Sequence, residues 1–337
     1  MSNRVLITGC AGFIGNETCR VMLEAGHDVA GIDNMNDYYD PGLKRARLNR
    51  LDGYSQFTFS EFDLVDDTRL RSLFEMFCPE YVIHLAAQAG VRYSKDNPAA
   101  YVHSNITATS ALLEACRQHH VTHLVFGSSS SVYGLNVDVP FSTRGRSEHP
   151  ASFYAATKRS GELMIHSYAH QYGLPATVLR FFTVYGPWGR PDMAPMLFSK
   201  AMLDGDSIPV FNYGEMERDF TYVDDVTECI QRIIMNPPSE YPEWAGEQGE
   251  PQTSSAPYRV FNVGNNAPVR LKDFISTLAN ALGVEPITDY VPMVRGDVLR
   301  TCADIDDLVT AFGYSPSTSL DVGIGRFVQW YRDYYAS

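Results

Sequence analysis

Short apolar segments bounded by turn residues alternate with helix-period segments through the first 180 residues of this 337-residue chain. Such alternation builds a parallel sheet, because two parallel strands need a long crossover connection between them. Amphipathic helices are expected after Gly15 and over residues 105–119. The strands are expected to be RVLITG from Arg4, DVAGID from Asp28, FTFSEFD from Phe57, YVIHLAA from Tyr81, HLVFGSS from His123 and TVLRFF from Thr177. The pattern predicts a doubly wound α/β sheet.

A second, smaller α/β domain is expected after Gly186, where Pro187, Pro191 and Pro195 lie close together. RVFNVG from Arg259 is expected to form one more strand of the first sheet. The predicted division therefore gives residues 1–182 to the first domain, with 218–237 and 258–264 returning to it. Residues 183–217 and 265–337 form the second domain.

The charge balance is acidic, with 40 Asp and Glu against 27 Lys and Arg, and no basic run is interleaved with aromatic residues. Nucleic acid and anionic membrane surfaces are therefore not expected as partners. The six cysteines are scattered singly, which is typical of reduced thiols in a cytoplasmic protein. The first strand begins too early for a signal peptide, and no apolar stretch is long enough to span a bilayer.

No metal site is expected. His166 and His170 lie four residues apart, as two ligands on one helical face would. They lack the glutamate of an HExxH motif and an obvious third ligand, so histidines at a surface or helix interface are the better interpretation.

Gly9, Gly12 and Gly15 follow the first strand directly and open a helix. Glycines at this place allow a dinucleotide pyrophosphate to approach the backbone and the positive end of the helix, although a plain strand-to-helix turn would look the same. Asp33 ends the second strand, where a carboxylate accepts hydrogen bonds from the adenosine ribose and repels a 2′-phosphate. The next residue is Asn34, and the nearby basic cluster of Lys44, Arg45 and Arg47 is interpreted as a solvated helix face. The sequence thus predicts a Rossmann domain that binds NAD rather than NADP.

Tyr154 and Lys158 lie four residues apart at an expected helix start, which places both on one face. A tyrosine phenol has a pKa near 10, and a neighbouring ammonium group favours the phenolate that a general base needs. GSSSSVYG, from Gly127 to Gly134, adds hydroxyl groups at the carboxyl end of the fifth strand, where ligands of open α/β sheets bind.

These elements resemble the extended short-chain dehydrogenase/reductase family, and longer segments narrow the resemblance to its UDP-glucuronate 4-epimerases. The matching segments are DNMNDYYDPGLKRARL, HLAAQAGVRYS, SSSSVYG, LRFFTVYGPWGRPDM, ERDFTYVDD, SSAPYRVFNVGNN and FVQWYRDYY. The resemblance implies that Tyr154 is the catalytic base, that Lys158 is its electrostatic partner and a ligand of the nicotinamide ribose, and that Ser129 bridges substrate and base. It also implies a homodimer that packs through helices near residues 105–119 and 154–171.

The resemblance further implies a cofactor site and a substrate site. The expected NAD ligands are Gly9, Gly12, Phe13, Ile14, Gly15, Asp33, Asn34, Asp63, Leu64, Leu85, Ala86, Ala87, Asn105, Tyr154, Lys158 and Phe181. The expected substrate ligands are Arg92, Ser129, Ser130, Ser131, Thr183, Arg190, Arg218 and Arg295.

Among these, Arg218 in ERDF matches the position that clamps the nucleotide diphosphate. Arg190 is expected to contact the sugar carboxylate or, alternatively, to form a structural ion pair. The family usually has Gln-Pro where this chain has Val294 and Arg295, which leaves the role of Arg295 open.

The implied reaction is reversible epimerisation of UDP-glucuronate to UDP-galacturonate at C4, with transient hydride transfer to tightly bound NAD through a 4-keto intermediate. That intermediate is a β-keto acid, so an epimerase must hold its carboxylate away from the alignment that releases carbon dioxide. The serine run and Thr183 offer hydroxyl groups for this purpose, and related neutral-sugar epimerases usually have Asn at the position of Thr183.

Four alternatives stand beside this interpretation. UDP-glucuronate decarboxylases typically carry Glu at the position of Ser131, and dehydratases carry an Asp-Glu pair at Ser130 and Ser131. A 4-epimerase of another UDP-sugar is disfavoured by Thr183 and Arg190. A non-catalytic NAD-binding regulator commonly lacks the tyrosine or the lysine, and this chain has both.

Overall fold

The computed structural model describes residues 2–244, 249–293 and 298–335. These residues fold into two compact units. The first comprises residues 1–137, 143–181 and 227–262, and the second comprises 138–142, 182–226 and 263–337. None of the helices within the described ranges is both long enough and apolar enough to cross a membrane.

The first unit is built on a seven-stranded sheet with the order β10-β6-β5-β4-β1-β2-β3. All neighbouring strands among β1, β2, β3, β4, β5 and β6 pair in parallel. For example, Val5 of β1 pairs with Val29 of β2 and with Tyr81 of β4. The strand order reverses between β1 and β4, so their carboxyl ends diverge and leave room for a ligand. The strands are β1 (Arg4–Thr8), β2 (Asp28–Asp33), β3 (Phe57–Glu61), β4 (Tyr81–His84), β5 (His123–Ser129), β6 (Ala176–Phe181) and β10 (Tyr258–Val263).

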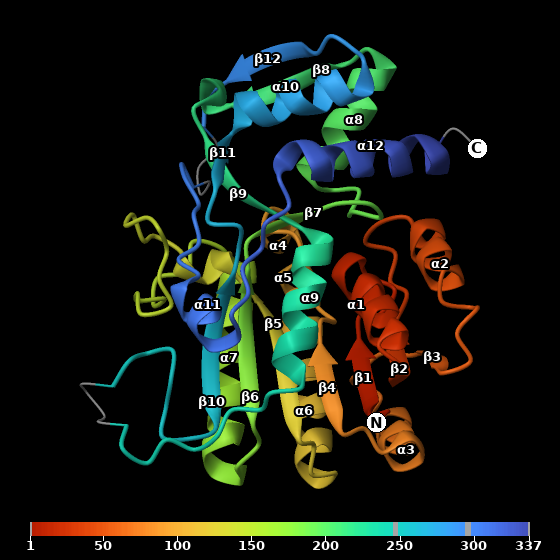
Figure 1. The fold of residues 1–337 in the computed structure, drawn as a ribbon, viewed down its shortest axis with the longest axis vertical. Helices are drawn as coiled ribbons and strands as arrows, with labels where there is room; N and C mark the ends of the chain where they lie inside the picture. The colour runs from red at the N-terminus through yellow and green to blue at the C-terminus, as the bar shows by residue number, and fades with distance from the viewer. Residues whose placement is uncertain (1, 245–248, 294–297, 336–337) are drawn as a thin grey trace. The chain divides into compact units, whose positions relative to one another are not determined.

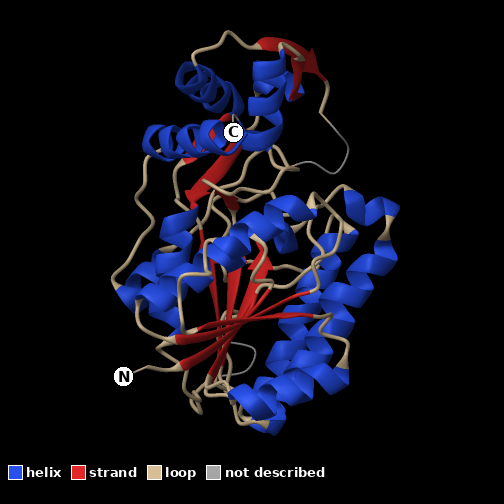
Figure 2. Ribbon diagram, turned by 90° about the vertical axis from the view of Figure 1, so that its right-hand side faces the viewer, coloured by secondary structure: helices blue, strands red, loops and turns tan. Residues whose placement is uncertain are grey.

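Helices lie on both faces of this sheet (Figure 2), as the doubly wound interpretation predicted. In Figure 1, α1 lies in front of the sheet and α6 and α7 lie behind it. The crossover segments are α1 (Phe13–Glu24), α2 (Pro41–Asn49), α3 (Asp67–Phe77), α4 (Tyr93–Asp96), α5 (Pro98–Tyr101), a π-helix η1 (Val102–Thr107), α6 (Ala108–Gln118), a 3₁₀ turn η2 (Ser130–Tyr133) and α7 (Phe153–Tyr172).

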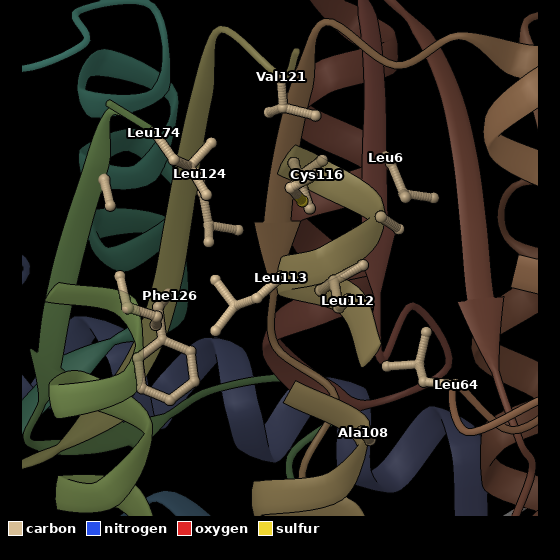
Figure 3. Close-up of a cluster of buried hydrophobic side chains, with 14 of the residues drawn as sticks. Leu6, Leu64, Ala108, Leu112, Leu113, Cys116, Val121, Leu124, Phe126 and Leu174 are labelled. Carbon is tan, nitrogen blue, oxygen red and sulfur yellow. The ribbon is translucent and has the colours of Figure 1, made fainter. Parts of the chain in front are cut away.

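The main apolar cluster fills the space between the sheet and the helices α3, α6 and α7. Leu113 of α6 points toward Phe126 and Leu124 of β5, and Cys116 lies among them (Figure 3). Because central strands such as β6 are buried on both faces, they appear in the sequence as continuous apolar runs. This core fixes the carboxyl ends of the strands, where the site residues lie.

The second unit contains a three-stranded sheet, β11-β9-β7, and a parallel pair, β12 and β8. Phe220 of β9 stacks on Phe274 of α10 with ring centroids 4.5 Å apart, which anchors that helix on the sheet. The elements are β7 (Thr183–Tyr185), α8 (Ala194–Asp204), β8 (Ser207–Phe211), a 3₁₀ turn η3 (Asn212–Gly214), β9 (Glu217–Tyr222), β11 (Pro268–Arg270), α10 (Leu271–Leu282), β12 (Ile287–Val291), α11 (Asp306–Phe312) and α12 (Leu320–Tyr335). Helix α9 (Val223–Ile234) begins in the second unit and ends in the first.

The observed division differs from the expected one at residues 138–142, 182, 218–226 and 263–264, which were expected in the first domain and belong to the second unit. For 218–222 the reason is strand pairing, because β9 bonds to β7 on one side and to β11 on the other. The helix expected over 105–119 is also divided, since residues 102–107 form a π-helix ahead of α6.

Candidate active site

The glycine loop joins β1 to α1 by a turn that side chains would block. Gly9 has a φ of +73°, and a Cβ there would lie 2.7 Å from the backbone nitrogen of Ala86. A Cβ on Gly15 would overlap the carbonyl oxygen of Gly9. Gly12 is the N-cap of α1 and supplies no capping side chain, so the positive end of the helix is directed into the turn. Phe13 and Ile14 complete this first turn.

Asp33 ends β2 beside the glycine loop and is only 9% exposed. Its Oδ2 accepts the backbone N–H of Ala11 at 3.1 Å, and its Oδ1 accepts that of Met35 at 2.9 Å. Burial raises the pKa of Asp33, although Lys44 and the two hydrogen bonds act in the opposite direction. The glycine loop thus holds the Asp33 carboxylate in place, and both the loop and Asp33 are expected to bind NAD.

The expectation that Lys44, Arg45 and Arg47 form a solvated helix face is wrong for two of the three. Arg45 is exposed, but Lys44 is 4% and Arg47 0% exposed. Lys44 Nζ donates to the carbonyl oxygen of Asn36 at 2.6 Å. Arg47 Nη1 donates to the carbonyl oxygen of Ala11 in the glycine loop at 3.0 Å. These two cations face inward because the loop and the segment after β2 provide carbonyl acceptors for them.

Asn34 and Asp63 form a polar pair at the ends of β2 and β3. Asn34 Nδ2 donates to Asp63 Oδ2 at 2.9 Å, and His103 Nε2 lies 3.2 Å from the same oxygen. Burial acts to raise the pKa of Asp63, but hydrogen bonds from Asn34, the Val65 backbone and His103 outweigh it and lower the pKa. The remaining expected NAD ligands lie just after β3, just after β4 and at the end of β6: Leu64, Leu85, Ala86, Ala87 and Phe181.

Asn105 lies in the π-helix and is 2% exposed. Its Oδ1 accepts the backbone N–H of Gln88 at 2.8 Å, and its Nδ2 donates to the carbonyl oxygen of Gln88 at 3.1 Å and to Thr157 Oγ1 at 2.9 Å. Thr157 in turn donates to the carbonyl oxygen of Tyr154 at 2.9 Å. Asn105 therefore joins the segment after β4 to the start of α7, and a π-turn is a frequent mark of functional helices.

Tyr154 and Lys158 occupy the first two turns of α7, which Ser152 caps by accepting the N–H of Ala155. Tyr154 is half-buried, and its ring meets that of Tyr101 edge-on with centroids 6.1 Å apart. Lys158 is 3% exposed, and its Nζ lies 4.5 Å from the centre of the Phe126 ring. Burial lowers the pKa of Lys158 to about 8, against an opposing influence of a carboxylate one turn further along the helix.

The serine run turns sharply at the end of β5. Ser129 ends the strand and accepts the backbone N–H of Ser131 at 3.2 Å, and Ser130 begins the 3₁₀ turn. The hydroxyl of Ser131 is buried and has no hydrogen-bond partner within the described ranges. A buried hydroxyl without a partner is costly, so it indicates a place where a ligand oxygen can bind.

In the second unit, Thr183 begins β7 and Arg218 lies on β9. Arg218 Nη1 donates to the carbonyl oxygen of its neighbour Glu217 at 2.9 Å. Arg190 makes a two-pronged contact with Asp192, at 3.0 and 2.9 Å, which favours the ion-pair alternative for this residue. Arg295 lies outside the described residues.

Arg92 lies in the first unit, is exposed and precedes α4. Most of the expected residues of the first unit thus lie at or just after the carboxyl ends of the parallel strands β1 to β6, and Asn105, Tyr154 and Lys158 lie on helical segments.

A buried glutamate was missed by the sequence interpretation. Glu162 follows Lys158 by one helical turn and is 0% exposed. It pairs with Arg180 of β6 at 2.8 Å and accepts the Ser128 hydroxyl at 2.6 Å. The signal was the spacing of Lys158 and Glu162 on one helical face, within the expected helix.

The residues present fit a dinucleotide. Glycines stand where any Cβ would fill the cradle, a helix amino end is directed into that cradle, and a carboxylate ends the next strand. The pyrophosphate would be held by the turn from Gly9 to Gly15, the adenosine ribose by Asp33, and the nicotinamide end by Tyr154 and Lys158.

Comparisons with known proteins agree over nearly the whole chain. A model described as the NAD dependent epimerase/dehydratase family matches residues 5–264. A probable UDP-glucuronate 4-epimerase of Rhizobium meliloti (strain 1021) is 46% identical over 336 residues, 98% of this chain and 98% of the relative. UDP-glucuronate 4-epimerase 4 of Arabidopsis thaliana is 46% identical over 338 residues, 98% of this chain and 76% of the relative.

A solved structure of a UDP-glucuronic acid 4-epimerase is also similar over nearly the whole chain. The UDP-glucuronic acid 4-epimerase of Bacillus cereus, in complex with UDP-glucuronic acid and NAD, superposes with a TM-score of 0.85. The two chains are 32% identical, and the match covers 98% of this chain and 99% of that one.

Proposed function

This chain belongs to the NAD dependent epimerase/dehydratase family, and from that premise we propose that it interconverts UDP-glucuronate and UDP-galacturonate by inverting C4. One observation supports this activity most directly. Lys158 is a buried cation one helical turn from the half-buried Tyr154 on α7, and the glycine loop of the same unit fits NAD.

Tyr154 is the acid–base group of the proposed reaction. The Lys158 ammonium favours the phenolate, because a neighbouring opposite charge favours an ionised group. As phenolate, Tyr154 takes the proton of the C4 hydroxyl, and as phenol it returns a proton when the configuration has been inverted. NAD, when bound, would supply a reversible hydride acceptor for C4. In this proposal Ser129, at the end of β5, holds the same sugar hydroxyl.

The remaining expected NAD contacts follow from the resemblance and the strand ends. The segments after β3 and β4 supply Asp63, Leu64, Leu85, Ala86 and Ala87, and the end of β6 supplies Phe181. Asn34 and Asn105 are assigned to the NAD site as well. Asn34 holds Asp63 after β3, and Asn105 holds Gln88 after β4.

The carboxylate of the sugar is held by hydroxyl groups in this proposal. Ser131 carries a buried hydroxyl without a partner within the described ranges, and Ser130 begins the same 3₁₀ turn. In this proposal the two hydroxyls keep the carboxylate out of line with the C4 ketone, which suppresses loss of carbon dioxide. Because Arg190 pairs with Asp192, we do not assign it the main contact with the sugar carboxylate.

The nucleotide is assigned to arginines. Arg218 suits the diphosphate because its guanidinium offers a fork of donors, and Arg92 is a further candidate. We assign the cofactor to the first unit and the UDP-sugar contacts of Thr183 and Arg218 to the second.

We further propose a homodimer that packs through α6 and α7, as the resemblance implies. On α7, Leu163 is 56% and Tyr172 52% exposed, which supports an apolar interface there. Light scattering of the purified protein tests the dimer. All six cysteines are unpaired, which supports a cytoplasmic location.

The proposed activity is tested by incubating the purified protein with UDP-glucuronate and NAD and following C4 configuration and carbon dioxide by NMR. UDP-galacturonate with little pentose product is expected. Dominant UDP-pentose would make the protein a decarboxylase. Turnover of UDP-glucose but not of UDP-glucuronate would make it a neutral-sugar epimerase. NAD binding with no turnover of any sugar nucleotide would favour the non-catalytic NAD-binding regulator.

A further inference from the structure

A buried charged cluster lies behind the Tyr154–Lys158 pair and is centred on Glu162. The carboxylate is 0% exposed and uses both oxygens. Oε1 accepts Ser128 Oγ at 2.6 Å and Arg180 Nε at 3.0 Å, and Oε2 accepts Arg180 Nη2 at 2.8 Å and Arg159 Nη1 at 2.7 Å. Burial acts to raise the pKa of Glu162, but the two arginines and Ser128 outweigh it and lower the pKa. The carboxylate is therefore ionised at neutral pH.

The cluster joins three elements. Glu162 and Arg159 lie on α7, Ser128 is the residue of β5 just before Ser129, and Arg180 of β6 pairs in register with Ser128. The helix also packs closely on β5, because a Cβ on Gly161 would lie 2.7 Å from the Phe126 ring. The charged contacts thus fix the position of α7 along β5, the strand that ends in the serine run.

Lys158 lies on the same face of α7 as Glu162, one turn earlier, and is sealed from water. A buried ammonium group tends to lose its proton unless a negative charge is near. The carboxylate of Glu162 is the group that counters burial at Lys158.

The other ionisable groups around Lys158 and Glu162 come from several elements. His84 of β4 is neutral, because burial and then Lys158 lower its pKa to about 3. Arg180 of β6 is cationic, and the pKa values of the buried phenols of Tyr133 and Tyr258 are raised. Apart from Tyr154 on its own helix, none of these groups offers Lys158 a negative charge, so Glu162 supplies it.

We propose that Glu162 is the positioning residue of the active site: held by Ser128, Arg159 and Arg180, it fixes α7 against β5 and β6 and keeps Lys158 charged. The inference rests on the proposed function, since it explains how Lys158 remains a cation while Tyr154 acts as base. Removing the carboxylate would leave buried positive charge beside Lys158, which then gives up its proton at lower pH.

The protonation of Lys158 can be measured without turnover. The chain has five lysines, at positions 44, 95, 158, 200 and 272, so ε-¹³C-lysine NMR gives few signals. Lys158→Arg identifies the signal of interest. In the wild-type protein this signal is expected to titrate near the pKa of about 8. In Glu162→Gln the midpoint is expected to fall by about one pH unit or more.

Arg159→Gln is the matched control. It removes a half-buried positive charge from the same carboxylate and leaves Glu162 with Arg180. In Arg159→Gln the titration midpoint of Lys158 is expected to be unchanged or higher, whereas in Glu162→Gln it is expected to fall. If Glu162→Gln does not fold, Glu162→Gln with Arg180→Met removes both buried charges. Its midpoint is still expected below that of the wild type, because Glu162 is the group that counters burial at Lys158.

An unchanged Lys158 midpoint in the variant without Glu162 would overturn the inference and leave the cluster a structural ion pair. Where the wild type turns over UDP-glucuronate, the basic limb of the kcat profile should move to lower pH in Glu162→Gln, whereas a purely structural loss would lower kcat without moving the limb. Absence of wild-type turnover would refute the proposed function, and the NMR result would still decide the role of Glu162.

Discussion

Gly15 packs directly against Gly9, so that even a methyl group on Gly15 would overlap the carbonyl oxygen of Gly9. The contact holds the first turn of α1 against the end of β1. It is a backbone contact, which no side-chain movement can relieve.

Gly15→Ala is therefore expected to lower the free energy of unfolding by about 1–3 kcal/mol or more and to weaken NAD binding, because the loop must shift. Gly53→Ala is the control, since a Cβ there meets nothing within 4 Å. Urea unfolding and calorimetric NAD titration measure both effects. Equal stability and NAD affinity in the two variants would contradict this view of the loop.

The strands could be predicted because their signal is local. The segment HLVFGSS was expected to form a strand, and β5 covers the same residues, His123–Ser129. Glycine spacing after β1 and the Tyr154–Lys158 pair at the start of α7 are equally local, and the structure has both features where they were expected.

Other features depend on partners distant in sequence. The sequence predicts Arg47 on a solvated helix face, yet its side chain is buried, because Ala11 offers a carbonyl acceptor 36 residues away. The π-turn at Asn105 is accompanied by side-chain bonds to Gln88 and Thr157, and the ion pair of Glu162 needs Arg180 from the neighbouring strand. No periodicity of a single segment contains this information.

Asp33→Asn is expected to weaken NAD binding about tenfold or more. The amide loses one of the two acceptors that hold the N–H groups of Ala11 and Met35, and it loses the charge that favours the ribose hydroxyls. Calorimetry with NAD and NADP measures the effect, and urea unfolding reports any loss of stability separately. Unchanged NAD affinity would show that the carboxylate does not bind the ribose.

Tyr154→Phe is expected to lower kcat by about 100-fold to 10,000-fold while NAD still binds, because it removes only the hydroxyl proposed as the acid–base group. Tyr168→Phe on the same helix is the control, since its hydroxyl makes only a 3.4 Å contact with Glu114. Kinetics are compared with the amount of NAD bound per chain. Retention of kcat in Tyr154→Phe would assign the proton transfer to another group.

Ser131→Ala tests the buried hydroxyl without a partner. Since no hydrogen bond within the described ranges is lost, the free energy of unfolding should stay within about 0.5 kcal/mol of the wild type or rise. If the hydroxyl holds the sugar carboxylate, KM for UDP-glucuronate should rise about tenfold, with more carbon dioxide per turnover. Ser199→Ala in α8 removes another such hydroxyl and should change neither quantity. Unchanged KM and carbon dioxide release in Ser131→Ala would remove Ser131 from the substrate site.

His84 makes folding stability dependent on pH. Its ring is 1% exposed and lies between Thr8 Oγ1 at 2.7 Å and Thr109 Oγ1 at 3.0 Å. Burial, and secondarily Lys158, lowers its pKa from 6.5 to about 3. Between these two values the unfolded chain binds the proton and the folded chain does not. The contribution of neutral His84 is therefore complete above about pH 6.5 and is lost as the pH falls toward 3, by up to about 1.4 kcal/mol per pH unit.

Replacement of this ring removes that dependence. His84→Gln is expected to be less stable at pH 7 because it loses a buried, hydrogen-bonded ring, and its stability should fall less steeply than that of the wild type between pH 6.5 and 4.5. Urea unfolding of both proteins across this range gives the two slopes, and the other titrating groups cancel in their difference. Parallel slopes would mean that His84 takes up a proton equally in the folded and unfolded chains, which would contradict a sealed, neutral ring between the two threonines.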